Sequence, residues 1–333
     1  FLFYTSSGLV AGGKLFETVF GLPYIWAVSA GVGSIILYTF FGGFLAVSWT
    51  DLVQGLLMAL ALVVVPVAAM GAAGGWSETW VQVRASNPEL LHALTDNQGS
   101  ALTWIAILSL LGWGLGYFGQ PHILARFMAI HSDSRVCQAR RIAIGWTALG
   151  LVGATLVGLA GVAYLDTPLT GADTEKVFMV LVGVLFHPVV AGVLLAAILA
   201  AIMSTADSQL LVSSSALAED FYKSLLRRNA SQRELVNMGR AAVIGVAAVA
   251  YVLALDPDSK VLNLVAYAWA GFGAAFGPTL MLSLYWRRMT RAGALAGIVA
   301  GGATVVVWKQ FDFGLFALYE LVPGFLISTL TVF

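Results

Sequence analysis

The sequence is poor in charge and in cysteine. Charged residues occupy only 10% of its 333 positions, and Cys137 is the one cysteine. A single cysteine excludes an internal disulfide and a cysteine-based metal cluster. Soluble domains carry about 25% charged and about 45–50% apolar residues, whereas this chain is 59% hydrophobic. The shortage of charge therefore excludes an ordinary soluble domain and predicts an all-α polytopic membrane protein.

Long apolar runs accompany the missing charge. A helix needs about 20 apolar residues to cross a hydrocarbon core of about 30 Å, and partial spans of this kind lie at 1–13 and 314–333. The runs are continuous and do not alternate with a period of two, which argues against strands. The whole spans are predicted at 24–47, 52–73, 101–125, 142–165, 188–218, 241–255, 261–286 and 292–308.

The few basic residues are distributed unevenly. If the spans alternate across the membrane, twelve Lys and Arg residues fall on one side and five on the other. Basic residues favour cytoplasmic loops, so the first side is predicted to be cytoplasmic, and segments 74–100 and 166–187 to be external. The chain begins at Phe1 and stops within an apolar run at 329–333. We therefore expect a piece of a longer protein, with one transmembrane domain over 1–333.

A hydroxyl pair interrupts the apolar run at 188–218. Pro188 is expected to start a helix here, because its missing N–H falls among the unpaired ones of the first turn. Ser204 and Thr205 lie about 24 Å from the outer end of that helix, inside the membrane. Their hydroxyls either bond to carbonyl groups one turn earlier, or form a site of neutral oxygens for a monovalent cation with the Ala201 carbonyl. Asp207 follows closely, and an ionisable residue inside a span indicates a function by default. A carboxylate stabilised by its neighbours beside an inner water cavity is the alternative.

Four glycines and a proline interrupt the run at 101–125. In GWGLGYFGQPH, residues 112–122, each glycine weakens a helix by about 1 kcal/mol and Pro121 by about 3 kcal/mol. Broken helices in a membrane line a cavity or are buried in protein. Trp113, Tyr117 and Pro121 are spaced i, i+4, i+8, which predicts that they share one helix face. This spacing agrees equally with close packing through small residues and with an aromatic-lined substrate pocket.

Asp51 follows two hydroxyl residues in FFGGFLAVSWTDLVQG, residues 40–55. Ser48 or Thr50 would cap a helix that starts here, and the helix dipole would favour Asp51 in its first turn. The sequence therefore predicts a helix start at this point, with a role in cation release as the alternative. A membrane enzyme has no support, because no nucleophile–base pair or metal cluster lies within a predicted span.

These motifs together resemble the bacterial sodium/proline symporters of the sodium:solute symporter family. The likeness covers essentially the whole chain, and GWGLGYFGQPHILARF is specific within the family. It implies a LeuT-like inverted-repeat core, a single transporter domain and uptake of L-proline with sodium across the bacterial cytoplasmic membrane. The segments that carry it are YTSSGLVAGGKLFE, YTFFGGFLAVSWTDLVQG, GWGLGYFGQPHILARFMA, AAILAAIMSTADSQLLVSSSALAEDFYK and VAYAWAGFGAAFGPTLMLS.

The resemblance also implies roles for single residues on the sodium pathway. The family's sodium ligands in this half of the protein fall on Ala201, Ser204 and Thr205, which favours the cation site over simple back-bonding. Its coupling aspartate falls on Asp51. Asp207 lies where the pattern of the family varies, so its role is not explained.

On the substrate pathway, residues implicated in proline binding fall on Trp113, Tyr117 and Pro121, and a gating tyrosine falls on Tyr4. The expected partners are L-proline, sodium and the lipid bilayer, with no nucleic acid and no cofactor beyond the transported ion. Two other functions stay open: a sodium-coupled symporter of another small solute such as pantothenate, and a transporter-like sensory membrane module.

Overall fold

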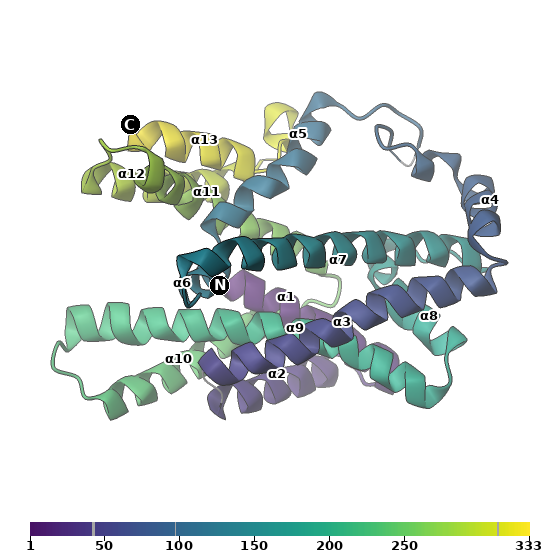
Figure 1. Cartoon of the computed structure of the whole chain (residues 1–333), viewed down its shortest axis with the longest axis horizontal. Coiled ribbons are helices and arrows are strands. Elements are labelled where there is room, and N and C mark those ends of the chain that lie inside the picture. Colours follow the sequence, from purple (N-terminus) through teal and green to yellow (C-terminus); the bar gives the residue numbers. More distant parts are fainter. Residues whose placement is uncertain (42–43, 97, 312) are drawn as a thin grey trace. The chain divides into compact units, whose positions relative to one another are not determined.

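The computed structural model describes residues 1–41, 44–96, 98–311 and 313–333, and these residues form helices and connecting loops with no strand (Figure 1). The chain is organised in two compact units. The first unit comprises Phe1–Leu91 and Cys137–Val261, and the second comprises His92–Val136 and Leu262–Phe333. Six of the described helices are long and apolar enough to cross a membrane, or seven if one bent pair is counted as a span. The predicted all-α membrane fold is therefore confirmed.

Eight α-helices of the described residues belong to the first unit. Their order follows the predicted spans, with additional short helices in the predicted external segments. They are α1 (Leu2–Phe20), α2 (Tyr24–Phe41), α3 (Phe44–Ala72), α4 (Trp76–Ser86), α7 (Val136–Tyr164), α8 (Val177–Leu185), α9 (Pro188–Ser215) and α10 (Gln232–Leu253). A π-helical segment, Ala216–Leu226, extends α9, and the short 3-10 helix η4 (Gly171–Lys176) precedes α8.

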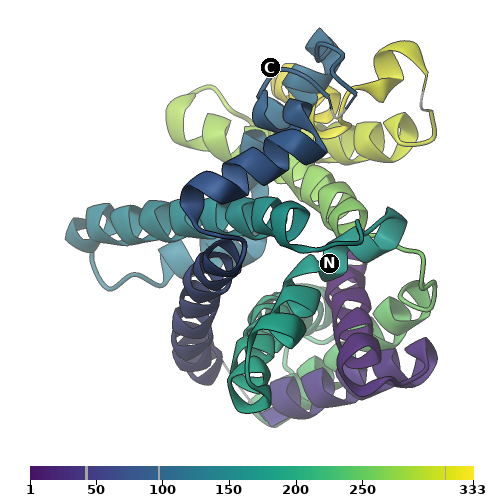
Figure 2. The same ribbon diagram turned by 90° about the vertical axis from the view of Figure 1, so that its right-hand side faces the viewer.

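Helices α1, α2, α9 and α10 pack against one another in the first unit (Figure 1). Helix α1 ends at Phe20, and the next residue, Gly21, has a φ of 65° that glycine adopts without steric cost. The chain then bends by 118° into α2, a turn visible between the two purple helices of Figure 2. Close packing of this pair depends on Gly13, because a methyl group there would overlap Val28.

A second layer of the first unit forms where α3 and α7 to α9 bury aliphatic side chains. Val65, Val157 and Leu181 are almost completely buried in this cluster. Gly153 allows α7 to approach the backbone of α3, since a Cβ atom at this position would lie 2.7 Å from the carbonyl oxygen of Leu62. Small residues at helix crossings let membrane helices gain close van der Waals contact.

Helix boundaries confirm one prediction and correct another. Helix α9 begins at Pro188, where the missing N–H of proline costs nothing. The predicted helix start at Asp51 is wrong: α3 begins at Phe44, so Asp51 lies about two turns inside the helix. Thr50 does not cap this helix, because its hydroxyl donates to the Val47 carbonyl oxygen at 2.9 Å. Gly42 and Gly43, which precede α3, lie outside the described residues.

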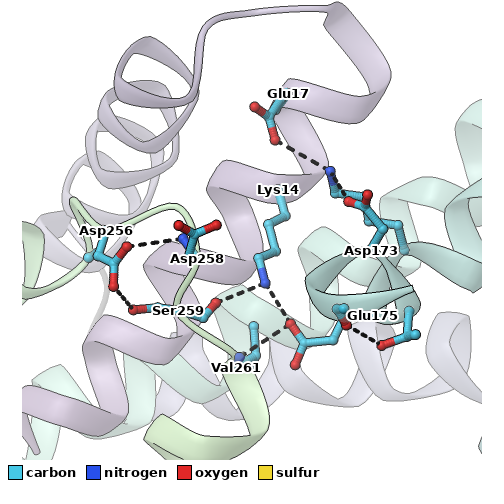
Figure 3. A network of polar contacts seen from close by, with 12 residues as sticks. Lys14, Glu17, Asp173, Glu175, Asp256, Asp258, Ser259 and Val261 are labelled. Carbon is cyan, nitrogen blue, oxygen red and sulfur yellow. Dashed lines mark hydrogen bonds and ion pairs between the residues drawn. The ribbon is translucent and has the colours of Figure 1, made fainter. Parts of the chain in front are cut away.

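Lys14 ties three segments of the first unit together (Figure 3). Its ammonium group lies 2.7 Å from a carboxylate oxygen of Glu175 in η4, and it also donates to the Ser259 carbonyl oxygen at 2.9 Å. The same Glu175 oxygen accepts the backbone N–H of Val261 at 3.3 Å. The buried side chain of Lys14 thus joins α1 to the 166–187 segment and to the loop that follows α10.

Lys176 forms a second contact between α1 and the 166–187 segment. Its ammonium group lies 2.9 Å from Asp173 and 3.6 Å from Glu17 at the end of α1. The hydrogen bond to Asp173 raises the pKa of Lys176 above its ordinary value. Lys176 therefore keeps its charge throughout the physiological pH range.

The second unit contains the predicted broken span. A 3-10 helix, η2, separates the two short α-helices of this span, and Gln120 has an extended conformation between η2 and the second of them. The discontinuity predicted from the glycines is therefore confirmed. The described helices of this unit are α5 (Trp104–Gly112), η2 (Trp113–Gly119), α6 (Pro121–Met128), η3 (Asp133–Arg135), α11 (Val261–Tyr285), α12 (Arg291–Trp308), η6 (Gly314–Ala317) and α13 (Leu321–Val332).

Candidate functional site

The three candidate sodium ligands occupy one turn of α9. The Ser204 hydroxyl donates to the Ala201 carbonyl oxygen at 3.1 Å, so the back-bonding alternative describes this hydrogen bond correctly. The same contact places two of the candidate ligand oxygens side by side, and Thr205 follows at the next position. All three residues are only half-buried. Neutral oxygens in such a cluster suit a monovalent cation, because they bind it weakly enough to release it.

A buried polar layer lies directly beyond this turn in the first unit. Asp207 is completely buried, and one of its carboxylate oxygens accepts a hydrogen bond of 2.6 Å from the Thr39 hydroxyl of α2. Its other oxygen, Oδ2, has no hydrogen-bond partner among the described residues. Gln209, also fully buried, accepts a bond of 3.4 Å from Thr5 of α1. Burial without full hydrogen bonding is costly, so Asp207 remains a candidate functional residue inside the span.

Asp51 and Tyr4 belong to the same unit as the candidate sodium ligands but lie on other helices. Asp51 lies on α3, which packs against α9, the helix of Asp207. Tyr4 is half-buried on α1, and its carbonyl oxygen accepts a bond of 2.7 Å from the Ser7 hydroxyl. The first unit thus brings the predicted sodium ligands, coupling aspartate and gating tyrosine onto helices that pack together.

The candidate substrate residues belong to the second unit. Trp113 and Tyr117 lie on η2, and Pro121 is the first residue of α6. The prediction that all three share one helix face is wrong, because it assumed a continuous α-helix. In a 3-10 helix of about three residues per turn, positions four apart diverge by about 120°. The extended backbone of Gln120 then separates Pro121 from η2.

Aromatic rings from α11 and from the loop between η6 (Gly314–Ala317) and α13 lie against Trp113. The Trp269 ring stacks on Trp113 with centroids 5.5 Å apart and an interplanar angle of 15°, and the Tyr319 ring lies 6.2 Å away at 14°. Tyr117 meets Trp269 edge-on, at 4.8 Å and 86°. Such offset and edge-on arrangements are the favourable ones for aromatic pairs. Sequence reasoning missed Trp269 and Tyr319, because neither has a local signal that connects it to residues 112–122.

The glycines of η2 make this packing possible. A methyl group on Gly116 would overlap the Trp269 ring, and one on Gly119 would overlap the carbonyl oxygen of Phe272. Close packing, one of the two alternatives in the sequence, is therefore confirmed. An aromatic-lined substrate pocket stays a prediction. Tyr117 itself is 44% exposed.

A family comparison agrees with this architecture. Residues 1–301 match the model of the sodium:solute symporter family. The chain belongs to this family. The predicted membership is thereby confirmed, and it makes the protein a membrane transporter component and not an enzyme.

Individual relatives of the chain agree with this family membership. The chain is 51% identical to the high-affinity proline transporter PutP of Bacillus subtilis over its whole length, which is 69% of that relative. It is 52% identical to the sodium/proline symporters of Salmonella typhimurium and Escherichia coli, again over the whole chain and over 66% of each relative. The chain thus spans about two thirds of the length of these relatives. Its apolar helices and bacterial relatives indicate a multi-pass protein of the bacterial cytoplasmic membrane.

A solved structure shows the same fold. A Na⁺-coupled sialic acid symporter in a substrate-bound, outward-open state superposes with a TM-score of 0.71, covering 99% of this chain and 72% of that chain at 18% identity. At such low identity the likeness concerns the fold alone. It agrees with the predicted LeuT-like class of membrane transporter.

Proposed function

We propose that this chain is part of a secondary active transporter that takes up L-proline together with sodium across the cytoplasmic membrane, with both units acting as one transporter domain. The observation that carries the proposal is the identity of about half of all residues, over the entire chain, with relatives named sodium/proline symporter or proline transporter. Sodium is cargo in this scheme, and no cofactor is needed.

On the sodium side, Ala201, Ser204 and Thr205 would supply one carbonyl and two hydroxyl oxygens. For the ion to bind, the Ser204 hydroxyl would turn a lone pair toward it while staying near the Ala201 carbonyl. Asp51 would couple sodium release to the change of state from α3, which packs against α9. Tyr4 would act as a gate.

On the substrate side, the chemistry of the broken span suits proline. Proline is a compact zwitterion with an apolar ring, and the segment 101–125 contains no Lys or Arg that could pair with its carboxylate. Backbone N–H groups at a helix break can satisfy a carboxylate. The faces of Trp113 and Tyr117 can accommodate both the apolar ring and the positive amine.

The driving force is adequate for one-to-one coupling. One charge that crosses about 100 mV provides about 2.3 kcal/mol, and a tenfold sodium gradient adds about 1.4 kcal/mol. Together these support an accumulation of several hundred-fold. Rocking of one helix bundle against another around the site would then expose it alternately to the two sides.

Uptake of radiolabelled solutes by the full-length protein in lipid vesicles tests the proposal. We expect proline uptake that depends on an imposed sodium gradient, and no comparable uptake of pantothenate. Replacing Trp113 or Tyr117 by Ala should raise the KM for proline far more than the sodium concentration at half-maximal uptake. Sodium-independent proline uptake, or a clear preference for pantothenate, would refute the assignment.

A further inference from the structure

Trp269 contacts both candidate aromatic residues of the substrate site. Its ring stacks on Trp113 and receives the edge of Tyr117. The side chain is only 4% exposed, so the ring itself is a buried part of the protein and offers little surface to a ligand. Its influence on the site must therefore act through the residues that it contacts.

The indole N–H of Trp269 fixes the beginning of η2. It donates to the carbonyl oxygen of Trp113 at 3.0 Å, and Trp113 is the residue at which α5 ends and the 3-10 helix begins. The bond thus acts where the backbone leaves α-helical geometry. The Trp269 ring also occupies the space beside Gly116 that any larger residue would need.

Gln120 fixes the other end of η2 to the same residue. Its side-chain NH₂ donates to the Gly116 carbonyl oxygen at 3.0 Å and to the Trp269 carbonyl oxygen at 3.2 Å. Both neighbours are acceptors, which determines the orientation of this completely buried amide. The indole and the backbone of Trp269 therefore hold η2 at its first residue and immediately after its last.

We propose that Trp269 is a positioning residue for the substrate site: it holds residues 113–119 in the 3-10 conformation and sets the orientation of the Trp113 and Tyr117 rings. Its effect on substrate rests on the proposed function, whereas its hold on the backbone does not. Because affinity depends on ring placement, loss of this hold should weaken substrate binding and leave the sodium ligands on α9 unaffected.

The test compares Trp269→Phe with Trp308→Phe in the full-length protein. Phenylalanine keeps a ring and removes the N–H donor. Trp308 is a matched control in the same unit, because its indole N–H also donates to a backbone carbonyl, that of Leu318, at 3.0 Å, and its ring packs on Phe316 at 4.5 Å. Two readouts are needed: hydrogen–deuterium exchange of the 113–119 amides, and the kinetics of sodium-driven proline uptake.

We expect faster exchange of residues 113–119 in Trp269→Phe and a KM for proline raised by about fivefold, the change that loss of one ordinary hydrogen bond produces. The maximal rate and the half-saturating sodium concentration should each change by less than about twofold, well below the effect of that one bond. Trp308→Phe should match the parent in both readouts. Gln120→Leu, which leaves the Trp269 side chain in place, should reproduce both effects if Trp269→Phe fails to insert.

Unchanged exchange in the Trp269 variant would overturn the proposal, and so would faster exchange with a parent-like KM, since that would make the contact merely structural. A parent protein that does not accumulate proline would refute the proposed function instead. The exchange comparison would then still decide whether Trp269 holds η2.

Discussion

The ion pair between Lys14 and Glu175 allows a quantitative prediction about the first unit. The side chain of Lys14 is 4% exposed and that of Glu175 is 23% exposed, with the charged atoms 2.7 Å apart. Lys14→Met removes the charge and keeps an unbranched chain of similar length. Glu175→Gln removes the opposite charge and retains a group that can accept hydrogen bonds. The coupling energy between the two substitutions measures the free energy of interaction between these two side chains.

The expected coupling lies between two limits. Unit charges 2.7 Å apart attract each other by about 1.5 kcal/mol in water and by about 6 kcal/mol at an effective dielectric constant of about 20. Lys14 is buried, whereas Glu175 still contacts water. We therefore expect a coupling of about 3 kcal/mol, at the lower end of what breaking a buried pair costs.

A double-mutant cycle on the free energy of unfolding in detergent, measured by SDS titration, provides the assay. Lys223 and Glu219 form a control pair of the same residue types, 2.8 Å apart but 39% and 44% exposed. Their coupling should be about 0.5 kcal/mol. If the Lys14–Glu175 coupling does not exceed that of the control pair, burial does not strengthen this contact and the reasoning is wrong.

Three further predictions concern the sodium site and helix packing. Ser204→Ala and Thr205→Ala should each raise the sodium concentration at half-maximal uptake by about tenfold, since a methyl group cannot replace a ligand oxygen; unchanged sodium curves would remove α9 from the site. Asp51→Asn should leave α3 intact, because this residue lies inside the helix, yet change the sodium response of uptake; parent-like kinetics would exclude a coupling role. Gly153→Ala should destabilise the protein by about 1–3 kcal/mol in SDS titration, because its Cβ atom would lie 2.7 Å from a carbonyl oxygen. Gly158 lies on the same helix, and a Cβ atom added there would have no atom of a neighbouring element within 4 Å. Gly158→Ala should therefore stabilise the protein by up to about 1 kcal/mol; equal effects of the two substitutions would contradict the packing argument.

Local signals made most of the fold predictable. Apolar runs of sufficient length located the spans, and Pro188 marked the start of α9 because proline restricts the backbone by itself. The error at Asp51 has the same local origin. A hydroxyl residue followed by an acid resembles a helix cap, but a threonine inside a helix can bond to the preceding turn instead, as Thr50 does. The short motif does not distinguish these two arrangements.

The candidate site was predictable only where its members are neighbours in the sequence. Ala201, Ser204 and Thr205 share one helical turn, so their proximity follows from helix geometry. The partner of Asp207 lies 168 residues away in the chain, and that of Trp113 lies 156 residues away. Hydrophobic periodicity contains no information about such pairings, which arise from the packing of whole helices.

The division of the chain into two interleaved units has a consequence for biosynthesis. The first unit is assembled from two separate stretches of sequence. Its early helices are therefore synthesised before the later helices against which they pack. Thr5 and Gln209 are 204 positions apart, which corresponds to about 10–40 s of synthesis at about 5–20 residues per second. During this interval the polar side chains of α1 lie without their eventual partners on α9. Newly made α1 and α2 therefore depend on water, lipid headgroups or the insertion machinery to shield these groups until α9 arrives.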